Sequence, residues 1–499
     1  MSVKPQIDRI AKAKLVKKVT RSSWFSLRFV WDKRWLIVAA IVGVALMHLP
    51  LPQGLTENGR TVLMMTVVAA LLFITAPVPL PSVALLIVIG EVMLLGVDST
   101  QVAKTLMSDS VLFIMGSLML AVAVVKQKFD KRIAWYIVRM MGTRTLNICV
   151  GITLVSALLS SVIGQHTVAA MMLPVGMTLV GLISDDPRKV RRLAVVVFLS
   201  IAYGSAASSI GTPSGAARNA IMIGYWKDFF YDPTDPQTRK YLVDYLRWII
   251  FAYPMALLQI PVVIIALFTT FRPEYRDISR AVVRLRAQLV ETGPLRAQDW
   301  ISVIMFFLVL AGWILFSDRL GMGTIALMGA IIFLVIGLVR WEDINTGVNW
   351  GVILIYAATI SLGVEMKQTG AAQWVAESFL GVMRPFGADH GLGLWAAIAT
   401  LTGAVSNTMS GGAAVAVLGP VVLKIASEAG ESPLVIGFLT AISSSFGYLT
   451  IFAAPSCAIV YASGYLKTTD FLAAGWKMLI MSIMVVLLSA LVYWPLLKF

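Results

Sequence analysis

Leu159-Ser-Ser-Val-Ile-Gly-Gln-His-Thr167 interrupts a hydrophobic run with small and polar residues, and Leu401-Thr-Gly-Ala-Val-Ser-Asn-Thr408 does the same about half a chain later. Inside a lipid bilayer, irregular polar backbone is tolerated only where it is packed in protein or lines a cavity. The two stretches therefore predict a binding site within a membrane protein, built from breaks in both halves of the chain.

The composition indicates a polytopic membrane protein. Of 499 residues, 58% are hydrophobic and 13% are charged, and the mean hydropathy is +0.84, which a soluble chain could not bury in its core. The net charge of +15 comes from basic residues clustered beside apolar runs, a pattern typical of membrane topology signals and not of nucleic-acid binding. Cys149 and Cys457 lie in apolar stretches, so no disulfide framework or cysteine-based metal site is expected.

Basic residues orient the first part of the chain. Residues 1–34 carry ten Lys or Arg, which predicts a cytoplasmic N-terminal segment. A basic stretch at 126–144 predicts an interfacial helix on the same side of the membrane. Between these two segments lie four predicted spans, each near the length that crosses a bilayer core of about 30 Å, at 35–51, 61–78, 80–97 and 108–126.

Two irregular segments complete the first half. Segment 146–183 is long for one span and is broken at Gly164-Gln165-His166, which predicts a re-entrant hairpin. Segment 193–225 is rich in Gly, Ser and Pro at its centre, which predicts a broken helix. A span at 247–269 follows, and the arginine-rich linker at 270–300 is predicted to be cytoplasmic.

The second half repeats this pattern. Its predicted spans, amphipathic stretch, hairpin, broken helix and final span lie at 301–316, 322–339, 349–366, 368–386, 391–428, 434–465 and 473–497. Duplication is supported by three pairs of similar sites: Lys126 and Lys367 lie 241 residues apart, His166 and Thr408 lie 242 apart, and Ala220 and Ala458 lie 238 apart. Because the predicted topology puts Lys126 inside and Lys367 outside, the repeat of residues 35–269 and 301–499 is expected to be inverted.

The predicted fold is an all-α polytopic membrane protein of the inner or plasma membrane, with about 11 transmembrane helices and two re-entrant hairpins. Its C-terminus is predicted to lie outside. Backbone amides at hairpin tips and at the starts of broken helices present unpaired N–H groups and a positive dipole end, which suit carboxylate or oxyanion oxygens. The carbonyl groups that such breaks free suit a small cation.

Five motifs occur in one order along the chain: Ala170-Met-Met-Leu-Pro174, Gly211-Thr-Pro-Ser-Gly215, Asn219-Ala-Ile221, Ser406-Asn-Thr408 and Ala458-Ile-Val-Tyr-Ala-Ser-Gly464. Together they resemble the divalent anion/sodium symporters (DASS), the INDY-like or SLC13-type transporters of the ion transporter superfamily. The resemblance covers nearly the whole chain beyond residue 35. It implies a homodimer in which each protomer has a scaffold domain and a transport domain that carries a small, dicarboxylate-like anion across the membrane by an elevator movement.

Carried over residue by residue, the resemblance implies a substrate site at the hairpin tips and broken helices. Its residues are Gly164, Gln165, His166, Thr167, Thr212, Pro213, Arg218, Asn219, Ser406, Asn407, Thr408, Pro455 and Ser456. A coupling sodium ion, if there is one, is expected near Gly164, Gln165, Gly211, Ser406, Asn407 and Ala454. No cofactor is expected, the coupling ion would be sodium or a proton, and the partners are the anion, membrane lipid and a second copy of the chain, without nucleic acid.

The sequence departs from the family pattern at several places. Gly164-Gln165-His166 stands where the first Ser-Asn-Thr triplet is expected, and Ala216-Ala217-Arg218-Asn219 replaces Ser-Pro-Pro-Asn. In the second half Ala454-Pro455-Ser456-Cys457 replaces Thr-Pro-Pro-Asn, and about four extra residues (Met409-Ser-Gly-Gly412) follow the triplet. The first tip has lost oxygen ligands and gained His166 and Arg218. Each also has a structural alternative, in which backbone carbonyls satisfy the side chain.

A fixed cation can neutralise an anion but cannot leave with it, so an empty carrier would cross the membrane with that charge uncompensated. The sequence therefore predicts sodium-independent anion exchange. Proton coupling through His166 and sodium symport are the alternatives, and an anion channel of the same fold is less favoured. A membrane hydrolase using Ser410 or Ser456 with His166 lacks an orienting acid, so the chain is predicted not to be an enzyme.

Overall fold

The computed structural model describes residues 33–127, 141–279 apart from 185 and 187, and 297–497 apart from 452. Across these residues the regular secondary structure is helical, with one isolated β-bridge between Arg144 and Asp277. Within the same ranges, nine helices are long and apolar enough to cross a membrane, and five shorter apolar helices accompany them. This confirms the all-α polytopic fold. The predicted N-terminal segment, the interfacial helix after Lys126 and most of the linker lie outside the described residues.

The helices of the first half follow one another in an order that the second half repeats. The first half contains α3 (Arg34–His48), α4 (Glu57–Thr75), α5 (Leu80–Leu94), α6 (Ser99–Leu106), α7 (Asp109–Lys126), α9 (Thr145–Ile163), α10 (Gln165–Gly181), α11 (Arg191–Ser208), the 3₁₀ turn η1 (Pro213–Gly215), α12 (Ala217–Phe230), η2 (Pro236–Tyr241) and α13 (Tyr245–Thr270). The second half contains α15 (Ala297–Leu320), α16 (Met322–Val335), α17 (Trp341–Gly347), α18 (Trp350–Gln368), α19 (Ala371–Met383), η3 (Arg384–Phe386), α20 (Gly391–Ser406), α21 (Gly411–Glu428), α22 (Pro433–Ser443), α23 (Pro455–Tyr461) and α24 (Thr468–Leu488), which continues through η4 (Ser489–Tyr493) into α25 (Trp494–Leu496). In each half, two or more apolar helices precede a helical hairpin, a broken helix and a long last helix.

The two hairpins turn in different ways. In the first hairpin Gly164 alone separates α9 from α10, with φ +85° and ψ 149°. Residues with a Cβ atom rarely adopt this backbone conformation. In the second hairpin four residues, 407–410, separate α20 from α21. Ser410 begins α21 as its N-cap, because its hydroxyl accepts the amide of Ala413 at 3.3 Å. All four turn residues and the start of α21 come from the polar triplet and the extra residues that follow it.

The broken helices satisfy their freed carbonyls with amide side chains. Between α11 and α12, Asn219 Nδ2 donates to the carbonyls of Ser209 (3.0 Å) and Thr212 (2.7 Å). Between α22 and α23, Asn407 Nδ2 donates to the carbonyl of Phe446 at 2.9 Å. Such carbonyls would otherwise be buried without a donor, at a cost of several kcal/mol each in an apolar medium.

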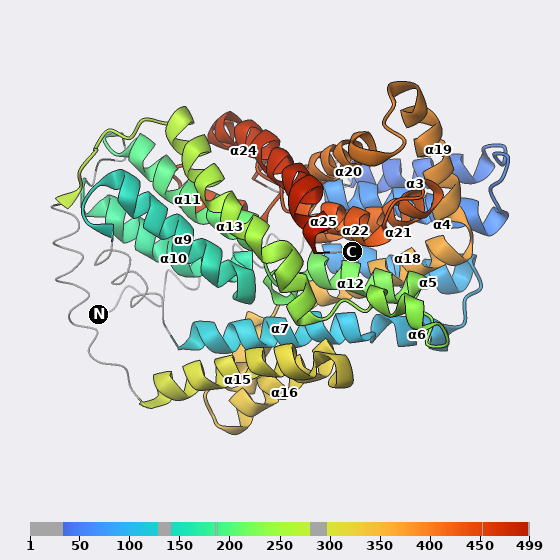
Figure 1. The fold of residues 1–499 in the computed structure, drawn as a ribbon, viewed down its shortest axis with the longest axis horizontal. Helices are drawn as coiled ribbons and strands as arrows, with labels where there is room; N and C mark the ends of the chain where they lie inside the picture. Colours follow the sequence, from blue (N-terminus) through green and yellow to red (C-terminus); the bar gives the residue numbers. More distant parts are fainter. Residues whose placement is uncertain are drawn as a thin grey trace, which may run out of the picture.

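Contacts between the halves occur in matched pairs. α7 packs on α16 while α18 packs on α5, and α10 packs on α23 while α21 packs on α12. In Figure 1, α7 runs beside α15 and α16 at the bottom of the view, and the hairpin of α9 and α10 lies on the opposite side from α20 and α21. Each hairpin is therefore packed against the broken helix of the other half, which brings all four breaks toward the interior.

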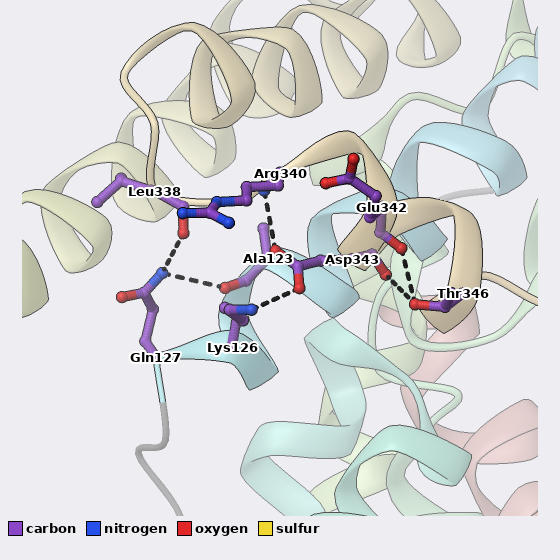
Figure 2. Close-up of polar contacts among 8 residues, drawn as sticks. All are labelled: Ala123, Lys126, Gln127, Leu338, Arg340, Glu342, Asp343 and Thr346. Atoms are coloured by element: carbon purple, nitrogen blue, oxygen red, sulfur yellow. Dashed lines mark hydrogen bonds and ion pairs between the residues drawn. The ribbon is translucent and has the colours of Figure 1, made fainter.

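A polar cluster joins α7 to the start of α17 (Figure 2). Lys126, the last residue of α7, forms an ion pair with Asp343. Asp343 also accepts the backbone amide of Arg340 at 3.0 Å, and Gln127 Nε2 donates to the carbonyl of Leu338 at 3.2 Å. The carboxylate of Asp343 therefore caps α17 and ties the two halves together.

The substitution Asp343→Asn tests this tie through its pH dependence. Donation from Lys126 and from the amide of Arg340 holds the pKa of Asp343 below its ordinary value of 3.8, so the carboxylate contributes stability at neutral pH that is lost as the pH falls through that lowered pKa. The melting temperature of wild type should be modestly above that of Asp343→Asn near neutral pH, and the difference should disappear as the pH falls below about 4. Glu342→Gln, which removes the neighbouring carboxylate, is the control. A difference that persists unchanged at the lowest pH would contradict the tie.

Candidate functional site

A cavity of about 210 Å³ lies where the breaks meet. Residues of both hairpins, of both broken helices and of α7 and α18 line it, namely Phe113, Ile114, Ser117, Leu118, Ile163, Gly164, Gln165, His166, Pro213, Ser214, Gly215, Ala216, Ala217, Arg218, Asn349, Val352, Tyr356, Ser410, Gly411, Gly412 and Pro455. Its volume suits a small ion or metabolite and is below that of typical drug-sized pockets. The cavity therefore occupies the place at which the sequence predicts a site.

The cavity brings together part of the predicted site. Six predicted residues line it: Gly164, Gln165, His166, Pro213, Arg218 and Pro455. Seven others are not among its lining residues: Thr167, Thr212, Asn219, Ser406, Asn407, Thr408 and Ser456. Of the positions predicted near a sodium ion, Gly211 and Ala454 also lie off the cavity wall. The predicted site thus divides into residues that face the cavity and residues behind it.

Helix starts dominate the cavity wall. α10 begins at Gln165, α12 at Ala217 and α21 at Gly411, and all three residues line the cavity. The first N–H groups of a helix lack partners within it and carry the positive end of its dipole. No Asp or Glu occurs among the described residues that line the cavity. The wall therefore presents a positive potential that favours a negatively charged ligand.

Arg218 adds a full positive charge to this wall. The side chain is 3% exposed, and its Nη2 donates to the hydroxyl of Ser209. Its Nε is buried without a hydrogen-bond partner, and none of the ion pairs in the described part of the chain includes Arg218. The backbone-carbonyl pairing that the sequence left open as an alternative is not seen, because the contact runs to a hydroxyl. The guanidinium is therefore a buried charge at the edge of a cavity.

The first hairpin tip offers a ring and an amide to the same space. His166 is exposed to the cavity, and Gln165 Oε1 is buried without a donor among the described residues. Both belong to the first turn of α10, directly after the Gly164 tip. The side chains that replace the expected triplet thus face the cavity from a helix start.

The Ser-Asn-Thr triplet at the second tip has a different role. Asn407 Nδ2 donates to the carbonyls of Gly403 (2.7 Å) and Phe446 (2.9 Å), and its Oδ1 accepts the amide of Leu449 at 2.8 Å. The hydroxyls of Ser406 and Thr408 donate to carbonyls of their own helix, at 2.9 and 2.8 Å. Of the triplet side chains, Asn407 therefore braces the break after α22, while Ser410, Gly411 and Gly412 face the cavity instead.

Other predicted residues support the wall from behind. Thr212 donates to the carbonyl of Ser161, which joins the first break to the first hairpin. A chain of hydroxyls continues from Thr212 to Ser214 at 3.1 Å and from Ser214 to Tyr245 at 2.9 Å. Ser456 donates to the carbonyl of Ala202 at 3.1 Å, which joins the second break to α11. These contacts fix the positions of the helix starts.

Sequence reasoning missed the residues that α7 and α18 contribute. Ser117 and Tyr356 lie in the middle of regular apolar helices, where no break or charge marks them. Asn349 is the N-cap of α18, because its Oδ1 accepts the amide of Val352 at 3.3 Å, and the capping pattern could have revealed that position. Nothing in the local sequence shows that these side chains reach the cavity.

The described residues offer few groups that could bind a metal ion or catalyse hydrolysis. A search of the described residues finds no group of three or more His, Cys, Asp or Glu side chains that could hold a metal ion. Ser410 and His166 both line the cavity, but none of the described lining residues is an acid that could orient a histidine. The groups present are suited to binding an anion.

Comparison with protein families gives one match over most of the chain. The model described as the sodium:sulfate symporter transmembrane region matches residues 30–499. An uncharacterised transporter of Haemophilus influenzae is 26% identical over 421 residues, covering 80% of this chain and 84% of that protein. A sodium-dependent high-affinity dicarboxylate transporter of Caenorhabditis elegans is 25% identical, with 87% and 83% covered. The sodium-dependent dicarboxylate transporter SdcS of Staphylococcus saprophyticus is 21% identical, with 91% and 89% covered.

Solved transporter structures share the fold. The YdaH transporter of Alcanivorax borkumensis aligns with a TM-score of 0.52 at 14% identity, covering 77% of this chain and 86% of that one. MtrF of Neisseria gonorrhoeae aligns with a TM-score of 0.52 at 12% identity, covering 92% and 95%. At these identities the likeness concerns the arrangement of helices.

The substitutions Asn407→Ala and Gln165→Ala should distinguish a structural side chain from one that binds the ligand. Asn407→Ala removes three side-chain hydrogen bonds and should destabilise the protein by about 2–4 kcal/mol. Gln165→Ala should leave the melting temperature of the purified protein near that of wild type, because Oε1 has no donor, and should weaken anion binding and uptake. Thermal melting in detergent and uptake into liposomes measure the two effects. A Gln165→Ala variant with full uptake would remove this residue from the site.

Proposed function

Because the chain belongs to the sodium:sulfate symporter family, we propose that it is a secondary transporter that couples the movement of a small, dicarboxylate-like anion to sodium. The chain is a multi-pass membrane protein, and its family and characterised relatives are transporters and not enzymes. The relatives of known substrate are named as sodium-dependent dicarboxylate transporters. The proposal extends that substrate class and that coupling ion to this chain.

The cavity is the observation that carries the proposal. Three helix starts and Arg218 face it, and the described lining contains no carboxylate. An acidic substrate is the ligand that this wall would stabilise most. The cavity also lies between two sets of helices, the hairpins with the broken helices on one side and α7 with α18 on the other. That position supports a movement of one set against the other.

Sodium coupling replaces the exchange that the sequence argument favoured. Sodium-independent exchange is not supported, because the relatives with a named activity depend on sodium. The first tip has lost some side-chain oxygens, but others remain beside it. Asn219 Oδ1 and Gln165 Oε1 are buried without donors in the described structure, and oxygens of this kind beside broken helices suit a small cation. Both support a sodium ion near the first tip.

The remaining parts of the proposal concern the architecture. The matched contacts between the halves support an inverted repeat of residues 35–269 and 301–499, which the positive-inside pattern orients with the N-terminus in the cytoplasm and the C-terminus outside. An elevator movement of the hairpins and broken helices past α7 and α18 would carry the cavity across the membrane. The family resemblance implies a homodimer of such protomers.

Uptake into proteoliposomes tests the function. With an inward sodium gradient, empty liposomes should accumulate labelled succinate, a four-carbon dicarboxylate, and replacing sodium with potassium should reduce the initial rate about tenfold or more. Liposomes preloaded with succinate but without a sodium gradient measure exchange, and an imposed proton gradient measures coupling through His166. Uptake that needs internal succinate and ignores sodium would restore the exchange mechanism. Uptake driven by protons alone would overturn sodium coupling.

A further inference from the structure

Arg218 is a buried guanidinium without a carboxylate partner in the described structure. Only 3% of the side chain is exposed, Nη2 is satisfied by the hydroxyl of Ser209, and Nε has no acceptor. Arginine stays protonated even when it is buried, so its charge has to be balanced by another group. Arg218 lines the cavity, so an anion bound there would balance the charge.

The start of α21 lies against this guanidinium. A methyl group built on Gly411 would lie 3.4 Å from Arg218 Nη1. Ser410 accepts the amides of Ala413 (3.3 Å, through its hydroxyl) and Ala414 (2.9 Å, through its carbonyl), which leaves the amides of Gly411 and Gly412 without acceptors among the described residues. A helix start and a guanidinium, both positive, thus lie side by side at the cavity wall, and an anion in contact with both would offset their repulsion.

Tyr356 of α18 completes this corner of the cavity. Its ring packs on Gly412, where an added methyl group would lie 2.6 Å from Tyr356 Cζ. The phenol therefore approaches the start of α21 because residue 412 has no side chain. Tyr356 and Arg218 both line the cavity, so the hydroxyl of Tyr356 is a further donor beside the guanidinium.

We propose that Arg218, the backbone amides of Gly411 and Gly412 and the hydroxyl of Tyr356 form a subsite for one carboxylate of the substrate. The inference rests on the proposed function, since it takes the substrate to be a dicarboxylate. The guanidinium donates in its planar fork to both oxygens, and the amides and the phenol hold the same group from the helix start. The second carboxylate lies at the other helix start, that of α10, beside His166.

This arrangement makes the two ends of the substrate unequal. The Arg218 end carries a permanent charge, so it requires a full anion and admits a monocarboxylate as readily as one end of a dicarboxylate. The α10 end carries a neutral amide, Gln165, and an imidazole, and it adds affinity only when a second acidic group is present. Removal of the Arg218 side chain should therefore weaken the binding of every carboxylate, and removal of the His166 side chain should weaken the binding of dicarboxylates alone.

Thermal melting of the purified full-length protein over a range of succinate and butyrate concentrations tests this pattern, since a ligand that binds the native state raises the melting temperature. In Arg218→Gln the affinity for both ligands should fall about 10- to 100-fold. In Tyr356→Phe both should fall by a smaller factor. In His166→Gln the affinity for succinate should fall to that for butyrate, while the affinity for butyrate stays unchanged. Arg239→Gln, at an exposed arginine of η2, is the charge-matched control.

The melting temperature without ligand separates a binding arginine from a structural one. Arg218→Gln should melt at or above wild type, because the variant loses a buried charge that has no counter-ion in the protein. A large drop, together with unchanged ligand affinity in Tyr356→Phe, would identify a structural arginine and overturn the subsite. If Arg218→Gln cannot be purified, Arg218→Lys and Tyr356→Phe decide the matter, and unchanged succinate affinity in both would likewise overturn it.

Uptake measurements distinguish a failure of the subsite from a failure of the proposed transport function. If succinate stabilises wild type but not Arg218→Gln, and no sodium-driven uptake occurs, the subsite stands and the transport proposal fails. If sodium drives succinate uptake in wild type and equally well in Arg218→Gln and Tyr356→Phe, transport stands and the subsite fails. A succinate-to-butyrate affinity ratio that His166→Gln leaves unchanged would overturn the placement of the second carboxylate.

Discussion

A polar backbone group in hydrocarbon must find its partner inside the protein, and this requirement shapes every irregular segment of the structure. The chain interrupts its helices at two hairpin tips and in two broken helices. Asn219 and Asn407 satisfy the carbonyls that the breaks expose, and Thr212 links the first break to the first hairpin. Carbonyls are thus satisfied behind the breaks, while the amides at the helix starts face the cavity. One arrangement of backbone both makes the breaks tolerable and lines the cavity with helix starts.

The charges within the membrane follow from the same arrangement. The helix starts and Arg218 make the cavity wall positive, and the acids of the apolar helices are kept away from it. Glu91 is fully buried between α5 and α18, where it accepts a hydrogen bond from Ser361 at 2.7 Å, and Glu365 lies one turn further along α18. Neither lines the cavity. The cavity wall therefore presents donors and positive charge to an anion without a competing carboxylate.

The sequence predicted the fold well because breaks in apolar runs are local features. Gly164, with its positive φ, and the Gly- and Pro-rich segment before α12 stand out against hydrophobic surroundings. Only some of the cavity-lining residues were predicted, because the direction of a side chain depends on packing between distant segments. The residues after Thr408 shift the start of α21 so that Ser410 and the two glycines occupy the place expected of the triplet. Tyr356 sits in a regular helix and reaches the cavity only because Gly412 lies opposite. The sequence favoured the exchange mechanism because side-chain charges can be counted from it, whereas the burial of the amide oxygens of Asn219 and Gln165 without donors cannot.

Two corresponding lysines show that similar halves can hold different contacts. Lys126 ends α7 and pairs with Asp343 (Figure 2), whereas Lys367, 241 residues later, donates to the carbonyls of Asp228 (2.7 Å) and Phe229 (2.9 Å). These carbonyls belong to the last turn of α12, where a cation also complements the helix dipole. The first broken helix is thus tied to α18, while α7 uses its equivalent lysine to hold the other half. If transport exchanges the roles of the two halves, as inverted repeats allow, α12 can move past α18 only when Lys367 releases its carbonyls. In such an exchange, the contact would couple the position of the cavity to the packing of the helices around it.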